Sequence, residues 1–212
     1  MSQDSIRPSA KQIRDAAQAI GYFLGDNSYA VVGGAACIVL GSTRATDDVD
    51  FVVPQGKTSN ARSILRAQTT YFRVEPRTLH TFYKGTPEVE IEILAPPRLF
   101  AEKFDDSTPT ITVEGVKILK PTLILNAKCR SIFGRADERK KQSDATDIRF
   151  LLQWCATNGV YPTAEEVPNA DKELVSWLIN KYPGQDSIWT NARYDWEKGP
   201  FPFSLFQTPT AN

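Results

Sequence analysis

The chain has 212 residues, of which 41% are hydrophobic and 24% are charged. This composition is typical of a globular protein with a packed core, and it excludes disordered and collagen-like chains. Basic and acidic residues both number 25, so the formal net charge is zero and no overall field attracts nucleic acid or an anionic membrane. The length suits one domain with a helical appendage.

The cysteines and the N-terminus indicate the compartment. Cys37, Cys129 and Cys155 lie far apart and form no CxxC pair, so they predict neither a disulfide framework nor a zinc site. The first residues are polar, and no run approaches the roughly 18 apolar residues that a membrane span needs. We therefore expect no membrane contact and a cytoplasmic protein, with the nucleus as the alternative.

The chain is expected to begin with an amphipathic helix. Ser9 is a favourable N-cap, Gly25 is a C-terminal stop, and apolar residues recur between them at helical spacing. A run of β-formers over residues 29–32 then ends at Gly33 and Gly34, which is typical of a buried strand that enters a tight turn. Small and apolar residues follow this turn and predict a second helix.

The next strand, residues 48–54, alternates acidic and apolar side chains. Because alternate residues of a strand point to the same face, Asp48 and Asp50 are expected to project together. A helix over residues 59–68 is expected after it, capped by Ser59 or Asn60.

Two segments, residues 78–84 and 88–94, are separated by Gly-Thr-Pro and predict a β-hairpin. In the second segment three glutamates share one face of the strand and three apolar residues share the other. Residues 108–121 are consistent with a further pair of short strands. His80, the only histidine, lies in the hairpin without a Cys or His partner, and we interpret it as structural.

Beyond Pro121 the pattern becomes helical, with three predicted helices within residues 122–135, 143–159 and 170–184. We therefore expect an α/β (α+β) fold, in which a mixed sheet is flanked by helices and followed by a C-terminal helical extension. The expected divisions are a core over residues 1–120, the extension over 121–190 and a Pro- and Phe-rich tail over 191–212.

The stretch from Gly33 to Asp50 carries the chemistry. A strand that runs through Gly-Gly into a helix presents backbone N–H groups and a positive helix end to an anion such as phosphate. Two carboxylates on one face of a rigid strand suit the oxygen coordination of Mg²⁺. A third carboxylate is expected from the hairpin, either Glu92 or, less favourably, Glu90. This layout favours metal-assisted nucleotidyl transfer.

The run Gly33-Gly34, thirteen intervening residues and Asp48-Val49-Asp50 resembles the defining motif of the DNA polymerase β-like nucleotidyltransferase superfamily. The spacing of Arg44 and Thr46 before these aspartates is similar to the small single-domain branch with abortive-infection, toxin-type and fungal nucleotidyltransferase-like proteins. The resemblance covers roughly residues 29–152.

The resemblance implies a nucleotidyltransferase fold that uses Mg²⁺ or Mn²⁺ and takes a nucleoside triphosphate (NTP) as substrate. Asp48 and Asp50 would hold the metal ions. The third acid, Glu92, would complete the catalytic triad and would polarise the acceptor hydroxyl for attack on the α-phosphate. The candidate ligands of the NTP phosphates are Gly33, Gly34, Ser42, Arg44 and Lys128.

The acceptor of the nucleotidyl group stays open among a small molecule, a protein and a tRNA end, because a fold does not choose among them. Two other interpretations also stay open. One is a catalytically inactive module that binds a nucleotide or a partner, and the other is a regulator of the toxin or antitoxin type.

Overall fold

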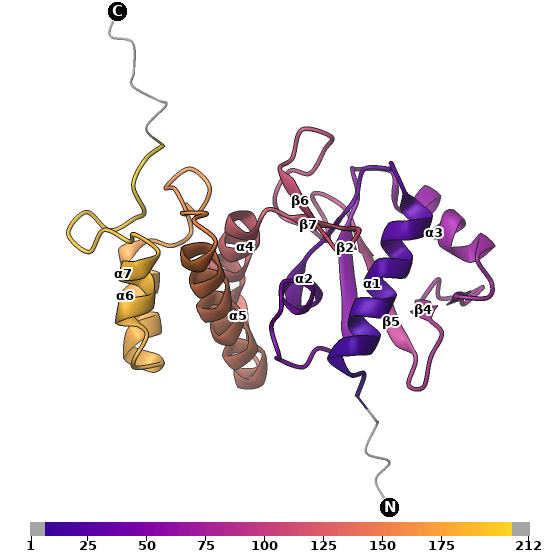
Figure 1. Cartoon of the computed structure of the whole chain (residues 1–212), viewed down its shortest axis with the longest axis horizontal. Coiled ribbons are helices and arrows are strands. Elements are labelled where there is room, and N and C mark those ends of the chain that lie inside the picture. Colours follow the sequence, from indigo (N-terminus) through magenta and orange to yellow (C-terminus); the bar gives the residue numbers. More distant parts are fainter. Residues whose placement is uncertain (1–6, 205–212) are drawn as a thin grey trace, which may run out of the picture. The chain divides into compact units, whose positions relative to one another are not determined.

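The computed structural model describes residues 7–204. The chain divides after Lys120 into two compact units. The first unit contains the sheet and three helices, and the second unit is helical (Figure 1). The expected mixed α/β fold is confirmed.

The sheet of the first unit has seven strands in the order β3-β4-β5-β2-β1-β7-β6. It is mixed, because β2 runs parallel to β5 and antiparallel to β1, while β1 and β7 are parallel. The strands are β1 (Ala30–Val31), β2 (Asp48–Val52), β3 (Phe72–Val74), β4 (Thr81–Tyr83), β5 (Val89–Leu94), β6 (Thr110–Val113) and β7 (Val116–Leu119). The antiparallel pairing of β4 with β5 confirms the predicted hairpin.

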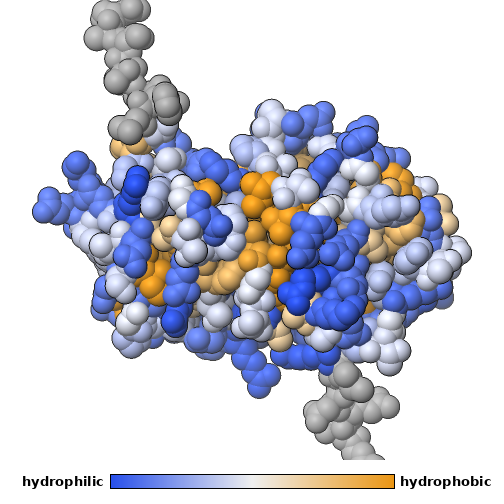
Figure 2. Space-filling model, viewed as in Figure 1, coloured by the Kyte–Doolittle hydropathy of each residue, from blue (hydrophilic) through white to orange (hydrophobic). Residues whose placement is uncertain are grey.

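Helix α1 (Ala10–Leu24) forms as the sequence predicts. The Ser9 hydroxyl accepts the N–H of Gln12, whose side chain accepts the N–H of Ser9, and Gly25 ends the helix with φ of 53°. Its buried apolar face packs against α2, α3, β2 and β7. Figure 1 shows α1 lying along the sheet, and Figure 2 shows hydrophilic residues on its outward side.

The other two helices of this unit are short. Helix α2 (Gly33–Val39) begins at the first glycine of the pair, and helix α3 (Thr58–Ala67) follows β2. The expected side-chain cap at Ser59 or Asn60 is wrong, because the N-cap of α3 is Lys57 and it makes no side-chain cap bond. A turn from Pro54 to Lys57 starts the helix earlier, with the N–H of Lys57 donating to the carbonyl of Pro54.

The second unit contains α4 (Pro121–Gly134), α5 (Glu138–Thr157), α6 (Lys172–Lys181) and α7 (Asp186–Asn191). Helix α5 begins five residues before the predicted start, because the Asp137 carboxylate accepts the N–H of Arg139 and caps it there. Phe201 from the Pro- and Phe-rich tail is buried beside Trp189 and Tyr194. Residues 205–212 of that tail lie outside the described residues.

All three cysteines are buried thiols. Among residues 7–204, no helix has the length and apolar character required to cross a membrane.

Candidate active site

The pairing of β2 with β5 positions the acidic side chains. These strands are parallel neighbours, and their register places Asp48 beside Glu90 and Asp50 beside Glu92. Paired residues on adjacent strands point to the same face of a sheet. The apolar residues between them, including Val49, Phe51 and Ile91, are buried on the opposite face. The buried face thus fixes the strands and leaves the carboxylates on the other side.

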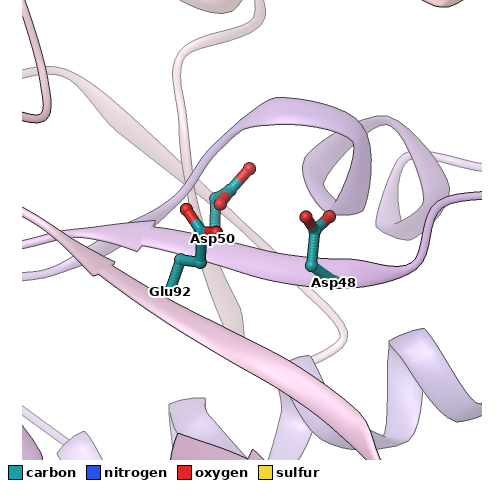
Figure 3. Close-up of side chains that lie close together, drawn as sticks. All are labelled: Asp48, Asp50 and Glu92. Carbon is teal, nitrogen blue, oxygen red and sulfur yellow. The ribbon is translucent and has the colours of Figure 1, made fainter. Parts of the chain in front are cut away.

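Asp48, Asp50 and Glu92 come together at this face. One carboxylate oxygen from each of the three lies within 4.8 Å of the other two. Asp48 and Asp50 are half-buried and Glu92 is exposed. Figure 3 shows all three side chains pointing to the same side of β2 and β5. We call this group the acidic triad.

The acidic triad has the donor set and size of a divalent cation site. Oxygen ligands at about 2.1 Å from Mg²⁺ lie about 3 to 4.2 Å from one another in an octahedron. The spread of 4.8 Å is therefore within about an ångström of what a shared cation needs. Three carboxylates this close repel one another, and a divalent cation between them would relieve that repulsion. Oxygen-only ligands suit Mg²⁺ or Mn²⁺.

Glu90 in β5 and Glu88, which directly precedes β5, have other partners. Glu90 Oε1 lies 2.6 Å from His80 Nδ1, and Glu88 Oε1 accepts a hydrogen bond of 3.0 Å from Arg73 Nε. Among the three glutamates, the structure places Glu92 with the two aspartates.

Gly33 lies directly against the acidic triad. A Cβ atom at this position would be 2.7 Å from Asp50 Oδ2, and the residue has φ of +64°. L-residues rarely adopt this left-handed conformation, so glycine is required for both reasons. The N–H of Val32 donates to the carbonyl of Asp50 at 2.9 Å and holds the chain to β2 just before the turn.

Gly34 lies against the segment that leads into β2. A Cβ atom there would clash with Arg44 Nη2 and would lie 2.9 Å from Thr46 Oγ1. Thr46 Oγ1 donates a hydrogen bond of 3.1 Å to Asp48 Oδ1, so it orients a triad carboxylate. The guanidinium of Arg44 thus lies beside the Gly-Gly turn, and its phosphate contact stays a prediction. Thr46 was not among the expected site residues, although it has the same parity as Asp48 and Asp50.

Ser42 has a local structural role in this segment. Its side chain is buried, its hydroxyl accepts the N–H of Arg44 at 3.3 Å, and its own N–H donates to the carbonyl of Cys37. These bonds close the turn after α2. The N-cap of α2 is Val32, which supplies no side-chain acceptor to the first turn of the helix.

Lys128 belongs to the second unit, in α4. Its ammonium lies 2.7 Å from Asp144 Oδ1 and 2.9 Å from Asp147 Oδ2, and both aspartates are buried. Asp144 also accepts from Arg135 Nε at 2.9 Å. Burial alone would raise the pKa of Asp144, but Lys128 and Arg135 outweigh it and hold the pKa below its usual value. The phosphate contact expected for Lys128 stays a prediction.

A helix that begins near Ser143, as the sequence pattern predicts, would have Asp144 in its first turn as a partner of the helix dipole, and Asp147 would pair with a nearby basic residue. The ion pair is confirmed, since Asp147 bonds to Lys128. The dipole role is wrong for Asp144, because α5 starts at Glu138 and Asp144 lies beyond its first turn.

Two cavities of about 360 and 240 Å³ also open on the first unit. The residues they share are Asp26, Ser28, Asp105 and Asp106, and neither cavity is lined by a residue of the acidic triad. The candidate chemistry therefore does not coincide with these cavities.

Comparisons with known proteins agree with the fold. No protein-family model matches the sequence, and no curated protein sequence matches it. Among solved structures, an antigenic nucleotidyltransferase-like protein from Paracoccidioides brasiliensis is similar, with a TM-score of 0.65 and 22% identity over 88% of this chain and 95% of that one. JHP933 from Helicobacter pylori is similar with a TM-score of 0.52 and 18% identity over 86% of this chain and 78% of that one. The chain therefore has the nucleotidyltransferase fold.

Proposed function

We propose that the protein is a metal-dependent nucleotidyltransferase that moves a nucleoside monophosphate from an NTP to an acceptor hydroxyl. The observation that carries this proposal is the acidic triad, three carboxylates within 4.8 Å of one another on one face of β2 and β5. The nucleotidyltransferase fold and the glycine turn against Asp50 support it.

Asp48, Asp50 and Glu92 would hold one or two Mg²⁺ or Mn²⁺ ions. Bound there, the ions would supply positive charge to the entering and leaving oxygens of an in-line displacement. Thr46 would keep Asp48 oriented through its hydrogen bond to Oδ1. The chain would thus provide a pre-formed set of ligands on a rigid pair of strands.

The triphosphate would lie over the Gly-Gly turn. Gly33 and Gly34 present no side chain there, so a phosphate could approach the backbone closely. Arg44, whose guanidinium lies beside Gly34, would supply charge and hydrogen-bond donors to the phosphate oxygens. Ser42 would support this arrangement by fixing the backbone of Arg44.

In the reaction, the acceptor oxygen would form a bond to the α-phosphorus of the NTP. The bond from that phosphorus to the oxygen bridging the β-phosphate would break, and pyrophosphate would leave with the electron pair. The hydroxyl proton must pass to a base on the acceptor side of the site.

The test is incubation of the purified protein with each α-³²P-labelled NTP and Mg²⁺ or Mn²⁺. Total RNA, total protein and a small-molecule extract are offered separately as acceptors. The proposal predicts label in one fraction with the wild type and none with the Asp48→Asn/Asp50→Asn variant. NTP binding without any transfer by the wild type would instead favour a non-catalytic module, and equal transfer by the variant would refute the role of the two aspartates.

A further inference from the structure

Strand β4 extends the face of the sheet that carries the acidic triad. It pairs with β5 on the side away from β2, and its register places Phe82 beside Glu90, which is itself beside Asp48. The pairing ends at Thr81, which lies opposite Ile91. His80, the only histidine of the chain, directly precedes Thr81 and has the same parity as Phe82. It therefore lies at the end of β4, beside the face of β5 that carries Glu90 and Glu92.

His80 is held in a defined orientation. Its Nδ1 lies 2.6 Å from Glu90 Oε1, and its ring is stacked on Phe82 with an interplanar angle of 17°. A carboxylate accepts hydrogen bonds, so Glu90 favours the tautomer in which Nδ1 carries the proton. The Nε2 lone pair is then available to accept a proton, as in the histidines of catalytic triads. About half of the His80 side chain is exposed, so a substrate can reach it.

Glu92 is a poorer candidate for the base. The proposed function assigns its carboxylate to the metal ions, with Asp48 and Asp50. A group outside the acidic triad is then needed to take the proton of the acceptor hydroxyl, and His80 lies outside it, beyond β5.

The proposed position of the triphosphate implies a direction for the reaction. Gly33 meets Asp50 from the side of β1 and α2, whereas His80 directly precedes β4, beyond β5. A triphosphate over the Gly-Gly turn would therefore lie on the opposite side of the pair formed by β2 and β5 from His80. An in-line displacement requires the entering and leaving oxygens to lie on opposite sides of the phosphorus. The acceptor therefore approaches from the side of His80.

We propose that His80, oriented by Glu90, is the base that receives the proton of the acceptor hydroxyl. This proposal rests on the proposed function. The acceptor oxygen forms the new bond to the α-phosphorus and its proton passes to Nε2 of His80. The bond between the α-phosphorus and the bridging oxygen breaks, and pyrophosphate leaves with that electron pair. The proton on Nδ1 stays in its bond to Glu90.

Arg73 neutralises part of the acidic charge on the surface beside His80. Arg73 lies over the Phe82 ring and pairs with Glu75 and with Glu88, so one guanidinium faces two carboxylates. The hydrogen bond from Thr78 is the main cause that lowers the pKa of Glu75, and the hydrogen bond from Arg73 is the main cause that lowers the pKa of Glu88. Both glutamates therefore stay ionised at neutral pH. Arg73, Arg77 and Lys84 balance Glu75, Glu88 and Glu90 in this part of the chain, so its charge does not choose among the acceptor classes.

The test compares wild type with His80→Asn and His80→Gln in the labelled transfer assay, with all three acceptor fractions. Asn can keep a bond to Glu90 and Gln can reach towards the Nε2 position, but neither side chain is a base. We expect kcat to fall about 100-fold or more in both variants, with the KM for NTP unchanged within about twofold. Arg77→Gln, an exposed change in the same hairpin, is the control and should transfer normally.

The outcomes separate the two proposals. A wild type that labels no fraction refutes the proposed function, and the role of His80 falls with it. Transfer by His80→Asn within threefold of wild type refutes the role of His80 alone. Because the chain has one histidine, the NMR spectrum of the whole chain labelled with ¹⁵N-histidine contains the signals of a single imidazole ring. A proton on Nε2 instead of Nδ1 at neutral pH would also overturn the proposal.

Discussion

Replacement of Gly33 by alanine separates backbone strain from damage to the acidic triad. Gly33 has φ of +64°, and a left-handed conformation costs a non-glycine residue about 1 to 2 kcal/mol. The new Cβ would lie 2.7 Å from Asp50 Oδ2, where ordinary contacts begin at 3.4 Å, so the carboxylate must retreat by about 0.7 Å. Metal sites tolerate shifts of only about 0.2 Å in ligand distance.

Gly56→Ala is the matched control. Gly56 also has a positive φ, of +80°, but a Cβ there would meet nothing within 4 Å. We expect both variants to lose about 1 to 2 kcal/mol in the free energy of unfolding, measured by urea denaturation. Only Gly33→Ala should weaken Mn²⁺ binding, by at least about tenfold in isothermal titration calorimetry. Equal Mn²⁺ affinity in Gly33→Ala and wild type would refute the placement of Asp50 in the metal site.

Three further predictions follow from single contacts. Thr46→Val removes the hydrogen bond to Asp48 and should weaken Mn²⁺ binding about tenfold in the same calorimetric titration. Lys128→Met leaves Asp144 and Asp147 buried without their cation and should lower the free energy of unfolding by about 3 to 5 kcal/mol in urea. The pKa of Asp144 is lowered on folding, so its stabilisation is present above about pH 4 and is lost as the pH falls below that value; Asp144→Asn should flatten the acid limb of the stability curve.

Each of these predictions has a contrary outcome. Thr112→Val, at an exposed position of β6, is the control for Thr46→Val, and equal Mn²⁺ affinities in the two variants would contradict the orienting bond. A loss below 1 kcal/mol in Lys128→Met would show that the two buried aspartates do not depend on that ammonium. An unchanged acid limb in Asp144→Asn would show that Asp144 has the same pKa in the folded and unfolded chains.

The local features of the site could be predicted from the sequence. The alternation of acidic and apolar residues in β2 places Asp48 and Asp50 on one face, because the period of a strand is two. The Gly-Gly pair predicts a tight turn, and the structure shows that the first position of this pair, Gly33, requires glycine. Both features depend only on residues close in sequence.

The third carboxylate could not be fixed in the same way. Glu88, Glu90 and Glu92 have the same parity, so the pattern of β5 alone does not choose among them. The choice depends on the register between β2 and β5, which lie about 40 residues apart, and on the partners of the other two glutamates. Arg73, on the edge strand β3, binds Glu88, and His80 binds Glu90. The short strand β3 has no clear sequence pattern, so the first of these partners could not be predicted.

Helix boundaries were also set by details that periodicity does not contain. The apolar pattern of α5 begins near Asp144, but Asp137, seven residues earlier, caps the helix, so the helix also includes the charged segment that starts at Glu138. Because of this extension, Asp144 does not lie at the end of the helix as expected. It is instead the buried partner of Lys128. Caps and tertiary ion pairs thus decided the roles that the pattern left open.

The most direct test of the central claim is to determine which phosphate bond the protein breaks. An NTP labelled with ³²P at the α-position and, in a parallel reaction, at the γ-position is incubated with Mn²⁺ and the three acceptor fractions. The account predicts the α-label on an acceptor and the γ-label in pyrophosphate, with both products lost in Asp48→Asn/Asp50→Asn. Release of the γ-label as orthophosphate, or its transfer to an acceptor, would contradict nucleotidyl transfer by the acidic triad.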